Sequence, residues 1–175
     1  MRTAAELELG VTSHIVLGLI AEAGEATPYD LKSMVANGVG DLWTVHHAQL
    51  YALAARLAEA GYLREEREHE GRRRKRYSLT DAGRRALESW LETSTDEVTE
   101  LRDHALVRLF FGADPAALAP AQVEAHRRRL ERYESQLRDF GSLMPRGRAL
   151  ALKAGTEHER VWVEFWARLA SGRSP

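Results

Sequence analysis

The first sixty residues contain three short segments in which hydrophobic residues recur at helical spacing. The first predicted helix covers residues 12–23, with Thr12 or Ser13 as its cap. The second runs from Thr27 and Pro28 to about residue 36, because a capping residue followed by proline is a common helix start. The third begins with a cap at Thr44 and is ended by Gly61. The positions expected to face the core are Ile15, Val16, Leu19, Ile20, Leu31, Met34, Val35, Leu50, Leu53, Ala54 and Leu57.

After Gly61 the pattern changes to two short strand-like runs on either side of Glu70 and Gly71. Tyr77 and Leu79 alternate with polar residues, so one face of the returning strand is expected to pack inward. Five consecutive cations fill the tip and the returning strand: Arg72, Arg73, Arg74, Lys75 and Arg76. Acidic residues of the first strand are expected to pair across the hairpin with some of the arginines, which leaves the tip net positive.

Three short helices followed by a basic hairpin are the order of elements in a winged helix-turn-helix. In such a module the third helix enters the major groove of DNA, and cations of the hairpin, or wing, lie on phosphates. The polar residues expected at the exposed front of the third helix are Thr44, His46, His47 and Gln49. Gln can bond adenine through two hydrogen bonds, and Thr or His can reach base edges or phosphates. The simpler alternative is an ordinary solvent-facing helix surface.

Beyond the wing the hydrophobic pattern stays helical to about residue 170. A helix that begins at Thr80 and Asp81 is expected to end near residue 92, and a cap at Ser94 starts a further helix to about residue 111. Long helices are predicted for residues 120–140 and, after a loop at residues 141–147, to about residue 170. We therefore expect a DNA-binding domain in residues 1–92 and a helical dimerisation and effector-sensing domain in residues 93–175.

The helix predicted for residues 120–140 carries a stripe with alternating spacings of three and four positions, as in a coiled-coil seam. This seam consists of Val123, His126, Leu130, Tyr133, Leu137 and Phe140. A long apolar stripe has to be buried, and a second copy of the chain would bury it in a two-fold dimer. Such a dimer places two third helices about 34 Å apart on DNA, or a multiple of that distance. The expected operator is therefore an inverted repeat.

Large aromatic side chains gather in the last two predicted helices. They are Tyr133, Phe140, Trp162, Phe165 and Trp166. Two explanations stay open at this point. Aromatic residues at helical spacing commonly pack in a core or a dimer contact. Alternatively, the same cluster could line a pocket for a small hydrophobic effector.

Composition limits the classes of function. The formal net charge is -1, and the first 92 residues hold 12 Lys and Arg against 14 Asp and Glu, so affinity for DNA depends on where the cations lie. The chain contains no cysteine, which excludes disulfides and thiolate zinc sites. It lacks phosphate-binding glycine loops, serine-hydrolase elbows and zinc-protease motifs. We expect no enzyme, cofactor or metal. No run reaches the roughly 20 apolar residues of a membrane span, and we expect a cytoplasmic protein.

Four stretches follow one another in the order and at the spacing of a known family. They are residues 13–20 (SHIVLGLI), 27–31 (TPYDL), 49–63 (QLYALAARLAEAGYL) and 74–83 (RKRYSLTDAG). Together with a helical C-terminal region, they resemble the PadR-like transcriptional regulators over residues 10–90. The resemblance implies that Tyr51 belongs to the DNA-contacting helix and that the C-terminal helices dimerise. It also implies a response to phenolic or other hydrophobic small molecules.

The sequence thus predicts a mainly α protein, with an N-terminal winged helix-turn-helix of three helices plus a β-hairpin wing and a C-terminal helical dimerisation region. The predicted function is that of a sequence-specific DNA-binding transcriptional regulator, namely a ligand-responsive repressor that acts as a homodimer on an inverted-repeat operator. The alternative is a helical protein-interaction module whose basic hairpin binds an acidic partner. Salt-dependent binding to duplex DNA distinguishes the two.

Overall fold

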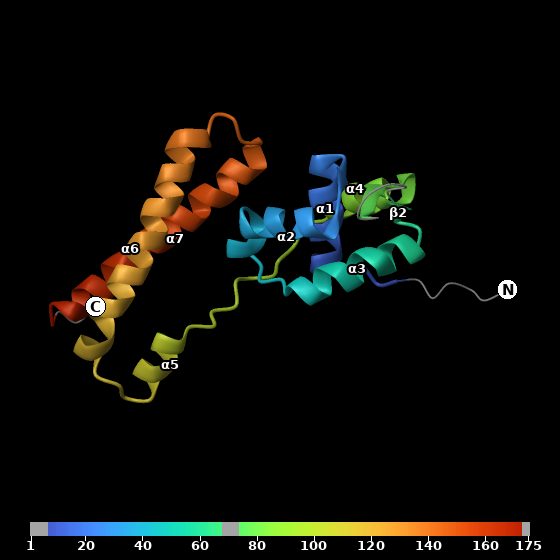
Figure 1. Cartoon of the computed structure of the whole chain (residues 1–175). Helices are drawn as coiled ribbons and strands as arrows, with labels where there is room; N and C mark the ends of the chain where they lie inside the picture. Colours follow the sequence, from blue (N-terminus) through green and yellow to red (C-terminus); the bar gives the residue numbers. More distant parts are fainter. Residues whose placement is uncertain (1–6, 68–73, 173–175) are drawn as a thin grey trace. The chain divides into compact units, whose positions relative to one another are not determined.

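The computed structural model describes residues 7–67 and 74–172, and the chain divides into two compact units, Met1–Glu97 and Val98–Pro175 (Figure 1). The first unit contains α1 (Val11–Ala23), β1 (Glu25–Ala26), α2 (Pro28–Ala36), the 3-10 helix η1 (Val39–Asp41), α3 (His47–Glu59), β2 (Leu63–Arg67), β3 (Lys75–Leu79) and α4 (Asp81–Glu92). The second unit contains α5 (His104–Phe110), α6 (Pro115–Phe140) and α7 (Arg146–Ala170). The predicted mainly α fold with an N-terminal winged helix is confirmed.

The first unit is built around a three-stranded antiparallel sheet in the order β1-β3-β2. Leu63 lies opposite Leu79 and Glu65 lies opposite Tyr77, so these side chains share one face of the sheet. Leu63, Tyr77 and Leu79 are buried on this face against the helices. Strand β1 was not expected from the sequence, because two residues are too few to show alternation.

Hydrophobic residues from every helix up to α3 meet in one core beneath the sheet. The buried members are Ile15, Val16, Leu17, Ile20, Ala26, Leu31, Val35, Val45, Leu50, Ala54, Leu57, Leu63, Tyr77 and Leu79. Most of the positions predicted to face the core are among them, while Leu19, Met34 and Leu53 are partly buried. The inward face of the predicted wing strand is confirmed by Tyr77 and Leu79.

The ends of the helices test the predicted caps. The start of α2 is confirmed: the Thr27 hydroxyl accepts a hydrogen bond from the Asp30 N–H (3.2 Å), and the Asp30 carboxylate accepts one from the Thr27 N–H (2.9 Å). The Thr80 hydroxyl likewise caps α4. The cap predicted at Thr12 or Ser13 is wrong, because Gly10 occupies that position and α1 begins at once with Val11.

The cap predicted for the third helix is also wrong. Thr44 lies outside α3, which begins at His47 with His46 in the cap position. The physical reason is Val45, whose side chain is buried in the core. Val45 lies buried in the stretch before the helix, so the helix starts two residues later than the sequence suggested.

The second unit differs from its predicted layout in two places. Residues 94–103 are not helical, and the helix predicted to start at Ser94 shrinks to α5, where the Asp103 carboxylate accepts hydrogen bonds from Ala105 N (2.7 Å) and Leu106 N (3.1 Å). Val98 and Leu101 in the non-helical stretch stay exposed, so no buried face holds it in a helix. Helix α6 starts at Pro115 rather than Pro120, capped by Asp114.

Helices α6 and α7 lie side by side as an antiparallel hairpin joined by residues 141–145 (Figure 1). A small core of Ala105, Ala119 and Trp166 connects the hairpin to α5. No helix among the described residues is long and apolar enough to span a membrane. Helix α4 ends at Glu92, and the first compact unit ends at Glu97. These boundaries do not test the assignment of DNA binding to residues 1–92 and of dimerisation to residues 93–175, which stays a prediction.

Candidate nucleic-acid interface

Helix α3 is buried on one side and exposed at its start. Leu50, Ala54 and Leu57 are completely buried. The predicted DNA-contacting residues at this end are all exposed: Thr44, His46, His47, Gln49 and Tyr51. No side chain among the described residues caps the start of α3 by a hydrogen bond. Its first N–H groups therefore remain open donors at the positive end of the helix dipole, which suits a phosphate.

The loop before α3 is anchored to the first helix. The indole Nε1 of Trp43 donates a hydrogen bond to the Thr12 hydroxyl in α1 (3.3 Å), although Trp43 itself is exposed. Together with the buried Val45, this contact fixes where α3 starts relative to the core. Sequence reasoning did not single out Trp43. The signal that could have identified it is an aromatic residue immediately before the polar start of a helix.

The wing forms where it was predicted, and two of its three described cations, Lys75 and Arg76, are paired with carboxylates. Lys75 Nζ lies 3.0 Å from Glu65 Oε2 across the hairpin, so the predicted cross-strand pairing occurs through a lysine. Arg76 pairs with Glu25 of β1 instead, at 2.5 Å. Arg74 is exposed beside them. The predicted contacts Arg72 and Arg73 lie outside the described residues.

Glu65 is the centre of the hydrogen-bonding at the base of the wing. It accepts hydrogen bonds from Lys75 (3.0 Å), from the Tyr77 hydroxyl (3.0 Å) and from Arg67 (3.2 Å). The hydrogen bond from Lys75 is the largest cause that lowers the pKa of the Glu65 carboxyl, against the opposing effect of burial. Burial and the hydrogen bond to Glu65 raise the pKa of Tyr77 to about 12.

The field of the wing cations extends to α2. Hydrogen bonds from the Thr27 backbone and hydroxyl lower the pKa of the Asp30 carboxyl, and Arg76 and Arg74 lower it further. The wing base and the start of α2 are therefore close enough to interact electrostatically. Acidic residues thus surround the described wing cations on more than one side.

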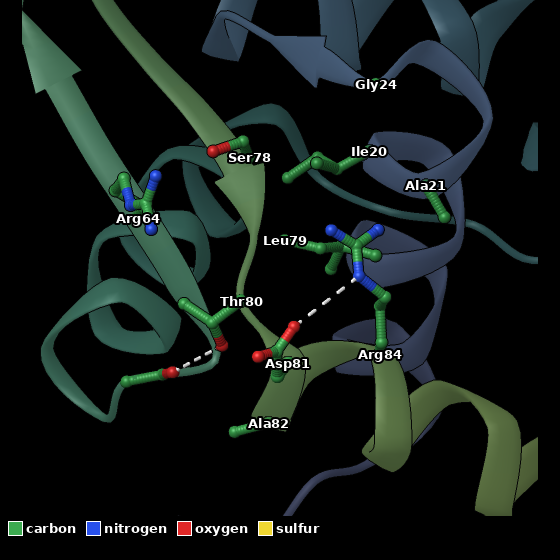
Figure 2. Close-up of a pocket in the computed structure, with 11 residues that line it drawn as sticks. Ile20, Ala21, Gly24, Arg64, Ser78, Leu79, Thr80, Asp81, Ala82 and Arg84 are labelled. Carbon is green, nitrogen blue, oxygen red and sulfur yellow. Dashed lines mark hydrogen bonds and ion pairs between the residues drawn. The ribbon is translucent and has the colours of Figure 1, made fainter.

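A cavity of about 480 Å³ lies in the first unit between the sheet, the end of α1 and the start of α4 (Figure 2). Its lining includes Gly24, Arg64, Ser78, Thr80 and Arg84. An ion pair of 4.0 Å joins Arg84 to Asp81, and the Thr80 hydroxyl donates to the Gly61 carbonyl (2.7 Å). None of the predicted site residues lines this cavity. Within residues 7–67 and 74–172 there is no cluster of metal-binding side chains.

The structure brings together three of the five predicted effector residues. Trp162 and Phe165 meet edge to face at 5.6 Å, and Phe165 and Trp166 do so at 5.2 Å. Tyr133 packs on Gly155 instead, and in the described chain no ring contact joins the exposed Phe140 to the others. The indole Nε1 of the fully buried Trp166 has no hydrogen-bond partner among the described residues.

Part of the predicted dimer seam is covered by α7 of the same chain. His126 Nδ1 lies 2.5 Å from Glu159 Oε2, and Glu159 also pairs with Arg129 at 3.2 Å. The buried ring of Tyr133 faces α7 as well. The remaining seam residues are half-buried or exposed: Val123, Leu130, Leu137 and Phe140. A dimer contact through the seam therefore stays a prediction that rests on these remaining residues.

Residues 16–89, which carry the helices, sheet and wing just described, match the model of the Transcriptional regulator PadR-like family. The winged-helix unit is thus similar to the PadR-like transcriptional regulators. The predicted resemblance is thereby confirmed. Members of the PadR-like family are regulators rather than enzymes, in agreement with the prediction that the chain is not an enzyme.

One curated relative is the negative transcriptional regulator PadR of Bacillus subtilis (strain 168). It is 27% identical over 103 residues, which cover 58% of this chain and 56% of the relative. The chain thus matches little more than half the length of that relative.

Solved structures extend the PadR-like likeness to most of the chain. Bacillus subtilis PadR in complex with operator DNA superposes with a TM-score of 0.82 at 22% identity, covering 93% of this chain and 97% of that one. The PadR-like regulator BC1756 from Bacillus cereus gives 0.77 at 19% identity, covering 91% and 96%. Bacillus subtilis PadR in complex with p-coumaric acid gives 0.75 at 21% identity, covering 93% and 98%. At these identities the likeness shows a shared fold.

Proposed function

We propose that the chain is a sequence-specific DNA-binding transcriptional regulator. The observation that carries the proposal is the division of α3 between a buried side and an exposed start. Leu50, Ala54 and Leu57 hold the helix rigidly in the core, while His47 and Gln49 project from its start with side chains that can bond base edges. A protein of the same fold has been solved in complex with operator DNA, which supports the same use of this surface.

The test is binding of the full chain to duplex DNA over a series of salt concentrations. Affinity should fall linearly with the logarithm of the salt concentration, since phosphate contacts release counterions. Substituting Arg74→Ala should weaken binding to every duplex and flatten the slope by roughly one unit. Arg85→Ala on α4, which removes the same charge away from α3 and the wing, is the matched control and should leave the slope unchanged.

A different outcome would favour the alternative function. If the chain bound an acidic polypeptide but showed no salt-dependent affinity for any duplex, the basic hairpin would serve a protein-interaction module. Selection of bound fragments from genomic DNA then decides the finer point. An inverted repeat among the selected fragments supports a two-fold dimer on its operator.

The proposed assembly is a homodimer held by the second unit. Large apolar side chains remain exposed in that unit of a single chain. They are Val98, Leu101, Val107, Phe110, Phe111, Phe140, Leu143, Leu150 and Val161. Exposed apolar surface on this scale is typical of a protein contact. A two-fold partner would cover it and give the two α3 helices the spacing of an inverted repeat.

We further propose that the regulator is a repressor released by a small hydrophobic or phenolic effector. Repression is supported by the curated relative, a negative regulator, and the effector by the relative solved with p-coumaric acid. In this chain the buried Nε1 of Trp166 is a donor that a ligand oxygen could satisfy. Titration calorimetry with p-coumaric acid tests the idea. Trp166→Phe should weaken binding, whereas Trp90→Phe in the first unit should not.

A further inference from the structure

Two adjacent wing cations are each held by a carboxylate of a neighbouring strand. Lys75 and Arg76 follow one another on β3, so their side chains point to opposite faces of the sheet. Glu65 of β2 lies opposite Tyr77, two positions from Lys75 on the same face. Glu25 of β1 lies opposite Ser78, two positions from Arg76 on the other face. Both ion pairs are therefore diagonal cross-strand pairs whose register is set by the backbone.

The two pairs differ in how firmly they are held. The Glu65 side chain is 24% exposed and also accepts hydrogen bonds from Tyr77 and Arg67, so Lys75 meets an immobilised carboxylate. Glu25 and Arg76 are 54% and 45% exposed and meet at 2.5 Å. An exposed pair of this kind is worth at most about 1 kcal/mol.

We infer that Glu25 and Glu65 withhold Arg76 and Lys75 from DNA, so that among the described wing cations Arg74 makes the phosphate contact. The inference rests on the proposed DNA-binding function and differs from the prediction made from the sequence, which gave Lys75 and Arg76 contacts with DNA. Non-specific affinity comes almost entirely from phosphate contacts. By occupying two cations, the carboxylates limit the affinity for bulk DNA without altering the exposed start of α3. Glu25 and Glu65 are thus residues that set the strength of non-specific binding.

The experiment compares Glu25→Gln with Glu66→Gln in the full chain. Both substitutions remove one negative charge from the same face of the sheet, and Glu66 lies directly opposite Arg76. Glu66, however, forms no ion pair within the described part of the chain. Affinity for a duplex of random sequence is measured over a salt series. Glu25→Gln should bind about two- to fivefold more tightly than Glu66→Gln, the range of one exposed ion pair. Its slope should be steeper by about 0.9, as one added phosphate contact requires.

A second pair of variants locates the gain on Arg76. Arg76→Ala should leave the salt slope of the otherwise unchanged chain as it is. The same substitution should cancel the whole gain when it is combined with Glu25→Gln. Thermal melting of each variant confirms that these changes at exposed residues leave the fold intact.

Two results would overturn the inference. Equal gains from Glu25→Gln and Glu66→Gln would mean that net charge alone matters, and a flatter slope for Arg76→Ala alone would mean that Arg76 already touches phosphate. A chain that shows no salt-dependent binding to any duplex would be a distinct result. It would overturn the proposed function itself, and this inference with it.

Discussion

The two units of the chain differ in how completely they bury their hydrophobic side chains. Among the described residues of the first unit, fourteen buried hydrophobic residues form one continuous core that includes the sheet and the inner side of α3. In the described part of the second unit, the corresponding cluster has three buried members, two of them alanines. Phe110 and Phe111 there are 84% and 81% exposed. The first unit can therefore hold α3 and the base of the wing by itself, whereas large apolar side chains of the second unit remain exposed in the single chain.

This contrast assigns separate tasks to the two units. A core that is complete within one chain positions α3 and the wing without help from another copy. We propose that the small core of the second unit makes it sensitive to assembly and to an effector that bonds the indole Nε1 of Trp166, which has no hydrogen-bond partner among the described residues. We propose that specific recognition of DNA belongs to the first unit and that dimerisation belongs to the second.

The largest effect is expected for substitutions in the seam of α6, which is predicted to form the dimer contact. Replacing Leu130 and Leu137 by Glu would bury uncompensated carboxylates in the seam, which should cost about 3–5 kcal/mol for each broken contact. Analytical ultracentrifugation should show a monomer at micromolar concentration. Ala121→Glu with Ala125→Glu on the exposed side of α6 is the matched control and should remain dimeric.

A double-Glu variant that stays dimeric would place the interface elsewhere. The exposed Phe110 and Phe111 at the C-terminal end of α5 would then be the next residues to test by the same substitution to Glu. Circular dichroism distinguishes dissociation from unfolding of the α6–α7 hairpin, because Leu130 and Leu137 are also half-buried within one chain.

A second prediction tests whether the core of the first unit is complete within one chain. Leu57 is fully buried in α3, and Leu42 in the loop before it is 62% exposed. Leu57→Ala should lower the free energy of unfolding by about 2–5 kcal/mol, because it removes packed atoms and leaves a cavity. Leu42→Ala should change it by less than about 0.5 kcal/mol. Denaturant unfolding of the full chain measures both. Equal losses would contradict a self-contained core.

Recognition should be separable from assembly. If Gln49 reads a base, Gln49→Ala should relax the preference at one operator position and cost about 1–3 kcal/mol there. The sedimentation of the variant should stay that of the original chain, since Gln49 is exposed at the start of α3. Equal losses on the operator and on random DNA would instead make Gln49 a phosphate contact.

The sequence predicted the first unit more fully than the second because local signals were stronger there. Thr27 and Pro28 mark the start of α2 through chemistry contained in a few residues, and Tyr77 and Leu79 show the inward face of the wing. The late start of α3 depends on the burial of Val45, and the pairing of Arg76 depends on Glu25, fifty-one residues away. Such long-range contacts leave no local pattern to read.

In the second unit, the same kind of reasoning gave a helix for residues 94–103 that the structure lacks. Apolar residues at helical spacing predict a helix only when something buries them, and Val98 and Leu101 remain exposed. The seam of α6 was predicted to face a second copy, and α7 of the same chain covers Tyr133 and His126. Periodicity identifies a stripe that must be buried, but it does not identify the partner.

The smallest expected effect is a pH dependence confined to the core of the first unit. His14 in α1 is buried and stacks on Trp90 of α4 with 4.7 Å between ring centres and a 6° angle between planes. Burial lowers the pKa of His14 below its ordinary value of 6.5, against the opposing hydrogen bond to the Gly10 carbonyl.

As the pH falls below 6.5, the unfolded chain takes up a proton before the folded chain does. Stability should therefore decline from pH 6.5 down to the lowered pKa of the folded state, and be fully retained above 6.5. Denaturant unfolding followed by circular dichroism measures this decline, which His14→Gln should remove between pH 6.5 and the lowered pKa. His158→Gln on the exposed side of α7 is the control that should keep it. An unchanged pH dependence in the His14 variant would show that the burial of this imidazole has no bearing on the stability of the winged helix.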